Sequence, residues 1–168
     1  MHPSRRFKPL STTRGSMDEV REFEAFVAEV EPRLRRALVA AYGSERGREA
    51  TAEALGWAWE HRDRMKRIEN KVAFLFRVGQ SKSRRRKQPI ILAEPEQRES
   101  WVEPGLGPAL ASLTERQRTA VVLVYGFGWT LREVADLTGV RISTVQSYLE
   151  RGLRHLRNAM KVVSDVGA

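Results

Sequence analysis

The sequence has no cysteine, which excludes disulfide bridges and thiolate metal sites. It also has no apolar run near the roughly 18 residues of a membrane-spanning helix, and no apolar stretch follows the basic N-terminus as in a secretory signal. The three histidines, His2, His61 and His155, lie far apart. There is no glycine-rich phosphate loop and no acidic cluster at metal-binding spacing. We therefore expect a cytoplasmic protein, not an enzyme, with no metal or cofactor.

Charge is plentiful but unevenly distributed. Lys and Arg number 30 against 21 acids, a formal net charge of +9. Residues 1–16 carry only basic charges, residues 18–31 are mostly acidic, residues 82–87 are basic except at Ser83, and residues 93–104 are acidic again. A basic excess favours polyanionic partners, most commonly nucleic acid. Separate acidic and basic segments indicate two kinds of partner.

Apolar spacing in the first half predicts three helices around a small core. The first runs from residue 17 to Tyr42, is ended by Gly43, and contains Pro32, which we expect to kink or split it. The second runs from about Glu45 to Met65, and the third from residue 68 or 69 into the basic segment. A stretch rich in proline, glycine and glutamate follows, which is typical of a linker.

The fold class predicted is all-α, with two small helical domains joined by a flexible linker. The expected layout is a flexible basic tail (1–16), a helical domain (17–87), a linker (88–105), a second helical domain (106–163) and a short tail (164–168).

The second domain has the spacing of a helix-turn-helix. Thr130 and Glu133 match a capping box that starts a helix. Ala135 is small where two helices would cross, Gly139 suits a left-handed turn, and Val145 would pack the next helix onto the first. A plain helical hairpin with a glycine turn is the alternative. A leader helix ending at Gly126 and Gly128 is expected to bury Leu113, the stem of Arg116, Ala120, Val121 and Val124.

In such a motif the second helix enters the major groove with its N-terminal residues on base edges. The outward residues there are Arg141, Ser143, Thr144, Gln146, Ser147 and Glu150. Arginine can pair with guanine and glutamine with adenine. Arg154, Arg157 and Lys161 lie further along and are expected to contact phosphates, with Arg151 at the boundary of the two groups. A solvated helix face is the alternative for these basic residues.

The stretch "LTERQRTAVVLVYGFGWTLREVADLTGVRISTVQSYLERGLRHLR" resembles region 4 of the extracytoplasmic-function sigma factors of bacterial RNA polymerase, which belong to the sigma-70 family. More loosely, "FEAFVAEVEPRLRRALVAAYG", "GREATAEALGWAWEHRDRM" and "AFLFRVGQSKSRRRKQ" resemble region 2 of the same family. The resemblance implies that region 4 reads the −35 promoter element, while region 2 engages the −10 element and core polymerase. It implies core RNA polymerase and promoter DNA as partners and allows for an anti-sigma factor.

Residue by residue, the resemblance assigns two groups of side chains in the first domain. Core polymerase would be bound by Glu49, Glu53, Trp57 and Trp59. The −10 element would be bound by Phe74, Lys82, Arg84, Arg85, Arg86 and Lys87. Trp59 and Phe76 are in phase with the apolar stripe and are expected in the core. Phe74 and Trp57 lie off that stripe, where stacking on unpaired bases is the open alternative.

Some positions depart from the family pattern. Ser81 and Arg85 stand where the family has Asn and Asp, which leaves the third helix almost purely basic and puts base-specific reading and melting in question. Arg141 replaces the usual Ser cap, and Ser143 with Gln146 offers a substitute, so the recognition helix is expected to start two residues late. A free-standing helix-turn-helix regulator with an N-terminal dimerisation or sensor bundle therefore remains the alternative function.

Overall fold

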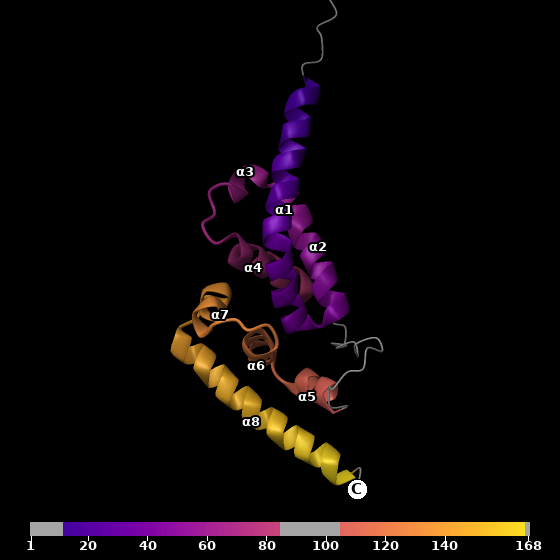
Figure 1. Ribbon diagram of the computed structural model, residues 1–168, viewed down its shortest axis with the longest axis vertical. Coiled ribbons are helices and arrows are strands. Elements are labelled where there is room, and N and C mark those ends of the chain that lie inside the picture. Colours follow the sequence, from indigo (N-terminus) through magenta and orange to yellow (C-terminus); the bar gives the residue numbers. More distant parts are fainter. Residues whose placement is uncertain (1–11, 85–104, 167–168) are drawn as a thin grey trace, which may run out of the picture.

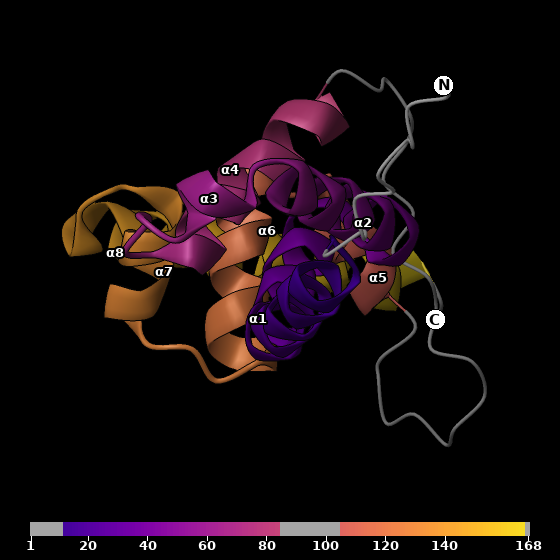
Figure 2. The same cartoon turned by 90° about the horizontal axis from the view of Figure 1, so that it is seen from above.

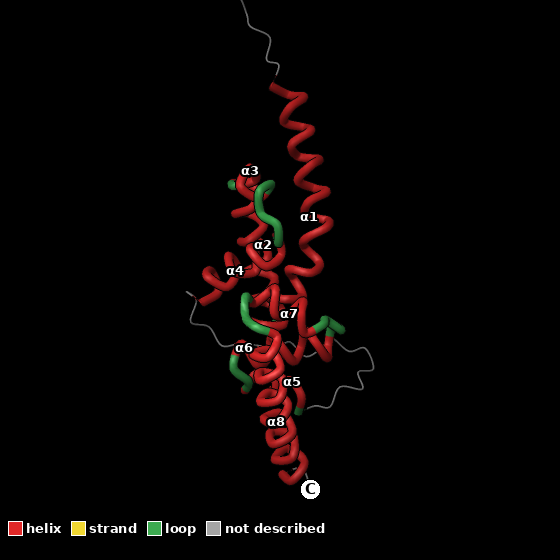
Figure 3. The backbone as a smooth tube through the Cα atoms, turned by 90° about the vertical axis from the view of Figure 1, so that its left-hand side faces the viewer, coloured by secondary structure: helices red, strands yellow, loops and turns green. Residues whose placement is uncertain are grey.

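The computed structural model describes residues 12–84 and 105–166, with side chains over 16–84 and 105–161. Its N-terminal half holds α1 (Thr12–Tyr42), α2 (Ser44–Glu60), the short α3 (Arg62–Met65) and α4 (Lys71–Arg84). Its C-terminal half holds α5 (Leu106–Ser112), α6 (Glu115–Val121), a π-helical turn η1 (Val122–Gly126), α7 (Leu131–Thr138) and α8 (Ile142–Val166). Every regular element in these ranges is helical (Figure 3), which confirms the all-α prediction. None of the helices described could cross a membrane.

Several sequence-based expectations fall outside the described residues. These are Arg85, Arg86, Lys87, residues 1–11 of the expected tail and the linker up to residue 104. The rest of the expected tail, from Thr12, is part of α1, so the first helix begins earlier than the predicted residue 17.

The N-terminal half is built on the pairing of α1 and α2. The longer α1 projects well beyond the other helices of this half (Figure 1). It runs unbroken through Pro32, so the expected split does not occur, and it ends at Gly43, whose φ of 83° lies in the left-handed region. After that turn α2 folds back so closely that a Cβ on Gly47 would lie 2.5 Å from the Cα of Val39. The expected second helix is interrupted at His61 instead of continuing to Met65.

The core of this half is formed by apolar residues of α1, α2 and α4. Leu34 and Leu38 of α1 are fully buried, as are Leu75 and Phe76 of α4. Small alanines at positions 50, 54 and 58 line the buried side of α2, which allows the close approach to α1. Phe76 therefore lies in the core, as its phase predicted. Trp59 does not, since it is 36% exposed and packs edge-on against Phe23, with ring centroids 4.9 Å apart.

The C-terminal half is layered around α6, which lies between α8 on one side and α1 on the other (Figures 1 and 2). Because both sides are covered, consecutive residues from Arg118 to Val121 are buried. The prediction had placed the stem of Arg116 on the buried side. That assignment is wrong, because Arg116 is exposed and Arg118 is 1% exposed. The π-helical turn that follows shifts the phase, so that Leu123 is fully buried and Val124 only partly.

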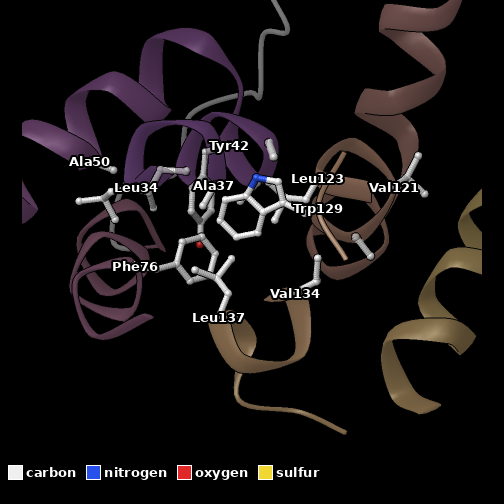
Figure 4. Close-up of a cluster of buried hydrophobic side chains, with 14 of the residues drawn as sticks. Leu34, Ala37, Tyr42, Ala50, Phe76, Val121, Leu123, Trp129, Val134 and Leu137 are labelled. Carbon is white, nitrogen blue, oxygen red and sulfur yellow. The ribbon is translucent and has the colours of Figure 1, made fainter. Parts of the chain in front are cut away.

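The two halves share one continuous hydrophobic core. Phe76 and Leu34 of the first half and Trp129, Val134 and Leu137 of the second lie in one buried cluster (Figure 4). The contacts that join them run from α1 to α6 and η1, and from α4 to α7. The sequence had suggested two modules tethered by a linker, and it gave no sign of this packing.

Arg118 connects the halves by hydrogen bonds. Its Nε and Nη2 donate to the carbonyl of Ala41, at 3.1 and 2.6 Å, near the C-terminal end of α1. Its Nη1 donates to the carbonyl of Leu113 at 2.9 Å and to that of Ala111 at 3.3 Å. Burial lowers the pKa of Arg118 from its usual value. A guanidinium thus satisfies helix-end carbonyls that the fold would otherwise bury without partners.

Candidate nucleic-acid interface

The first helix of the expected helix-turn-helix is fixed by its cap. Oε2 of Glu133 accepts from the backbone N of Thr130 at 2.8 Å, and the backbone N of Glu133 donates to Oγ1 of Thr130 at 3.2 Å. The predicted capping box at the start of α7 is therefore present. The Thr130 backbone hydrogen bond, followed by one from Arg33, lowers the pKa of Glu133.

The turn has the geometry that its residues predicted. Gly139 has φ 70° and ψ 30°, and its backbone N donates to the carbonyl of Ala135 at 2.8 Å. An L side chain is disfavoured at that φ, so glycine suits the position. Ala135 is 5% exposed and Val145 fully buried, so both lie in the core where α7 and α8 pack together.

The recognition helix starts without the expected delay. Val145 donates its backbone N to the carbonyl of Arg141 at 3.1 Å, and α8 begins at Ile142, not two residues later. The exposed residues on its outer side are Arg141, Ser143, Gln146, Glu150, Arg151, Arg154, Arg157 and Lys161, so one acid interrupts the face. Thr144 and Ser147 are half-buried, and the Ser147 hydroxyl donates to the carbonyl of Ser143 at 3.1 Å. From Arg151 onward this face of α8 presents basic residues, whereas the stretch before it carries Ser143, Gln146 and Glu150.

The side chains assigned to the −10 element are only partly brought together. Phe74 is half-buried against Trp57, with ring centroids 5.3 Å apart, and the Arg64 guanidinium lies 5.5 Å from the Phe74 centroid and 5.7 Å from the Trp57 centroid. The two off-stripe aromatics therefore meet each other, although the resemblance assigns them to different partners. Lys82 is exposed near the end of α4.

Arg84 has an intramolecular partner. Its Nη2 lies 2.9 Å from Oε1 of Glu115 in the other half. Sequence reasoning missed this partner and the role of Arg118, because no local spacing indicates contacts between residues so distant in the chain. It also missed Arg64, which belongs to no motif.

The side chains assigned to core polymerase do not share one side of α2. Trp57 packs against Phe74 of α4 and Trp59 against Phe23 of α1, whereas Glu49 and Glu53 lie one turn apart on its outer side. Glu49 is exposed and Glu53 half-buried, while Trp59 follows near the end of the helix. Gly56 lies on the same side, and a Cβ placed on it would meet nothing within 4 Å. Glycine in a helix interior costs about 0.5–1 kcal/mol relative to alanine, and nothing in the described chain requires it here.

Among the residues that the structure describes, no group of three or more His, Cys, Asp or Glu side chains is placed to hold a metal ion.

Residues 106–156, which hold α5, α6, α7 and the first part of α8, match the family model "Sigma-70, region 4". The chain carries a sigma-70 region 4. The resemblance drawn from the sequence is thereby confirmed for this unit. No curated protein matches the chain.

Two solved structures share the fold of region 4 together with the N-terminal half. One is the sigma factor RpoE of Bartonella quintana in complex with the anti-sigma factor NepR, with a TM-score of 0.64 and 22% identity, covering 84% of this chain and 98% of that one. The other is CnrH in complex with the cytosolic domain of CnrY, with a TM-score of 0.58 and 22% identity, covering 84% of this chain and 89% of that one.

Proposed function

We propose that this chain is a sigma factor of the extracytoplasmic-function type, which binds core RNA polymerase and directs initiation at specific promoters. The observation that carries the proposal is a region 4 helix-turn-helix with its outer face exposed, joined to a helical bundle in the arrangement of a solved sigma factor. A single helix-turn-helix neutralises few phosphates and binds weakly alone. Held on polymerase beside a second DNA-binding helix, it gains effective concentration without any new contact.

In this proposal α8 reads the upstream (−35) element. Arg141, Ser143 and Gln146 would contact base edges near the start of the helix, with Thr144, Ser147 and Arg151 beside them. Arg154, Arg157 and Lys161 would contact phosphates, which position the helix without reading sequence. Their exposure along one face of α8 supports these roles.

The N-terminal half would bind the −10 element through α4 and the basic residues that follow it. Lys82 and Arg84 would contact the backbone, and the Trp57, Arg64 and Phe74 cluster would offer a surface for an unpaired base. Charge reversal at Arg84, Arg85 and Arg86 should weaken promoter opening. Unchanged open-complex formation would remove this segment from the proposal.

Core polymerase would bind the outer side of α2 through Glu49, Glu53 and Trp59. The open space at Gly56 supports a close approach by a partner helix there. Gly56→Leu should therefore reduce affinity for core polymerase, whereas Ala25→Leu on the exposed side of α1 should not. Equal affinities of the two variants would place the contact elsewhere.

An anti-sigma factor is proposed as a further partner. RpoE was solved with its anti-sigma factor bound, and this chain shares its fold over most of its length.

The decisive experiment is co-elution of the purified chain with core polymerase, followed by transcription from a defined promoter. The proposal expects a stable complex and a discrete transcript that requires both components. A chain that ignores polymerase and binds duplex DNA as a dimer would instead be the free-standing regulator.

A further inference from the structure

A cavity of about 230 Å³ lies between α4 and the helix-turn-helix, and its walls carry more positive than negative charge. Residues of α4, α6, α7 and α8 line it. Its charged side chains are those of Arg77, Arg84 and Arg116 and a single carboxylate, that of Glu115. Sites for drug-sized molecules measure about 300–1,000 Å³, so this cavity suits a smaller ligand.

The one carboxylate of the cavity already has its partners. Oε1 of Glu115 accepts from Nη2 of Arg84 at 2.9 Å and from Nε2 of Gln80 at 3.0 Å. Among the residues that the structure describes, no ion pair joins Arg77 or Arg116 to an acid. The cavity therefore holds two guanidinium groups whose charge is not balanced within the described part of the chain.

These guanidinium groups are placed with donors to offer. Nη1 of Arg116 donates to the hydroxyl of Tyr148 at 3.2 Å, which leaves the hydroxyl proton available for another acceptor. Nη2 of Arg77 lies 3.2 Å from the position that a Cβ on Gly139 would take. Because residue 139 has no side chain, the guanidinium of Arg77 can come this close to the turn. Donors from α4, α6 and α8 thus line one small cavity.

The remaining walls favour the binding of an anion. Phe76, Ala120 and Val134 also line the cavity, and each is at most 1% exposed. Charges interact more strongly beside such apolar walls than in bulk water, because the effective dielectric constant is lower. A guanidinium group is planar and presents paired N–H donors, which match the oxygens of a phosphate group.

We propose that this cavity binds a small phosphate- or pyrophosphate-bearing molecule through Arg77, Arg116 and the hydroxyl of Tyr148. The backbone of duplex DNA offers the same phosphate chemistry, but the cavity is too small to admit a DNA strand. The ligand is therefore a free molecule and not the promoter. This site goes beyond the proposed function and does not depend on it.

The test is calorimetric titration of the full-length chain with pyrophosphate, in a phosphate-free buffer at fixed ionic strength. Saturable binding at a single site is expected. A hydrogen bond to a charged group changes affinity by about tenfold or more, so Arg77→Gln and Arg116→Gln should each weaken binding at least about tenfold. Tyr148→Phe removes only the hydroxyl and should weaken it by about two- to tenfold. Arg67→Gln is the matched control, since it removes the same charge from an exposed position outside the cavity and should leave the affinity unchanged.

Two further measurements separate this site from general attraction of anions. Pyrophosphate should raise the melting temperature of the unmodified chain and of Arg67→Gln, but not that of Arg77→Gln, because only a ligand that binds the folded state stabilises it. Arg77→Gln, Arg116→Gln and Arg67→Gln should bind a random-sequence duplex with equal affinity. Arg77 and Arg116 are exposed, so the variants should fold, which circular dichroism checks.

The proposal is overturned if pyrophosphate binding does not saturate, or if Arg77→Gln and Arg116→Gln bind pyrophosphate as tightly as Arg67→Gln. It is also overturned if these two variants lose affinity for the duplex alone, since the arginines would then belong to a DNA-binding surface. None of these measurements uses polymerase, so failure to bind polymerase would refute the proposed function and leave this site standing.

Discussion

Replacing Arg118 by methionine should separate the contribution of the buried guanidinium from that of its aliphatic stem. Arg118 is 1% exposed and donates to carbonyls of Ala41, Ala111 and Leu113. Arg118→Met keeps an apolar side chain of similar length but leaves those carbonyls without their donors. Each hydrogen bond from a charged donor contributes about 1.5–3 kcal/mol. Counted once for each of the carbonyls of Ala41 and Leu113, these interactions represent about 3–6 kcal/mol before any compensation.

Part of that energy offsets the burial of a charge, which is also why the pKa of Arg118 is lowered. We therefore expect a net loss of about 2–4 kcal/mol in the free energy of unfolding, a large share of the usual 5–15 kcal/mol. With a urea m-value of about 1–3 kcal/mol/M, the midpoint should fall by roughly 1–2 M. Because Arg118 joins the halves, the variant should also unfold less cooperatively.

The assay is urea unfolding followed by circular dichroism at 222 nm. Arg116→Met is the matched control, since Arg116 is exposed and, within the described residues, donates to the Tyr148 hydroxyl at 3.2 Å. It should lie within about 0.5 kcal/mol of the unmodified chain. An equal, small effect of both substitutions would refute the assigned role of Arg118.

Three further predictions concern the helix-turn-helix. Gln146→Ala should change preference at one or two bases of the upstream element, measured by binding to a substituted series of duplexes, whereas a uniform loss across the series would mark Gln146 as a phosphate or packing residue. Val145→Ala should cost about 2 kcal/mol in urea unfolding because Val145 is fully buried, and a cost below 0.5 kcal/mol would mean that α8 does not pack there as described. The lowered pKa of Glu133 means that its ionised form stabilises the fold above its usual value of 4.5, and that this contribution is lost as the pH falls through the lowered pKa. Glu133→Gln should accordingly destabilise the chain more at pH 7 than at pH 3, and an equal difference at both pH values would contradict the cap.

The helix-turn-helix could be predicted from the sequence because each of its features depends on residues close together in the chain. The Thr130 and Glu133 cap, the left-handed glycine at 139 and the buried Val145 each depend on residues a few positions apart. The same holds for the end of α1 at Gly43. Helical periodicity predicted the wrong buried residues where a helix is covered on two sides. Because α6 packs against both α1 and α8, its buried residues are consecutive, and single-face periodicity selected Arg116 in place of Arg118.

In the candidate site too, local features could be predicted from the sequence, whereas contacts between distant residues could not. The outward face of α8 follows from helical phase, although the start of that helix at Ile142 was placed too late because Ser143 and Gln146 imitate a cap. Contacts between the halves could not be predicted, since the Arg84–Glu115 and Arg33–Glu133 ion pairs join residues far apart in sequence. The aromatic contact between Trp57 and Phe74 was likewise hidden, because each lies off the apolar stripe of its own helix.

The central claim is that polymerase sets the two helical units at a fixed spacing on promoter DNA. The most direct test is transcription of a randomised promoter library with this chain and core polymerase. The account predicts enrichment of two short sequence blocks at one constant separation, with Gln146→Ala altering the upstream block alone. Enrichment of a single palindromic site, or the same enrichment by binding without core polymerase, would contradict it.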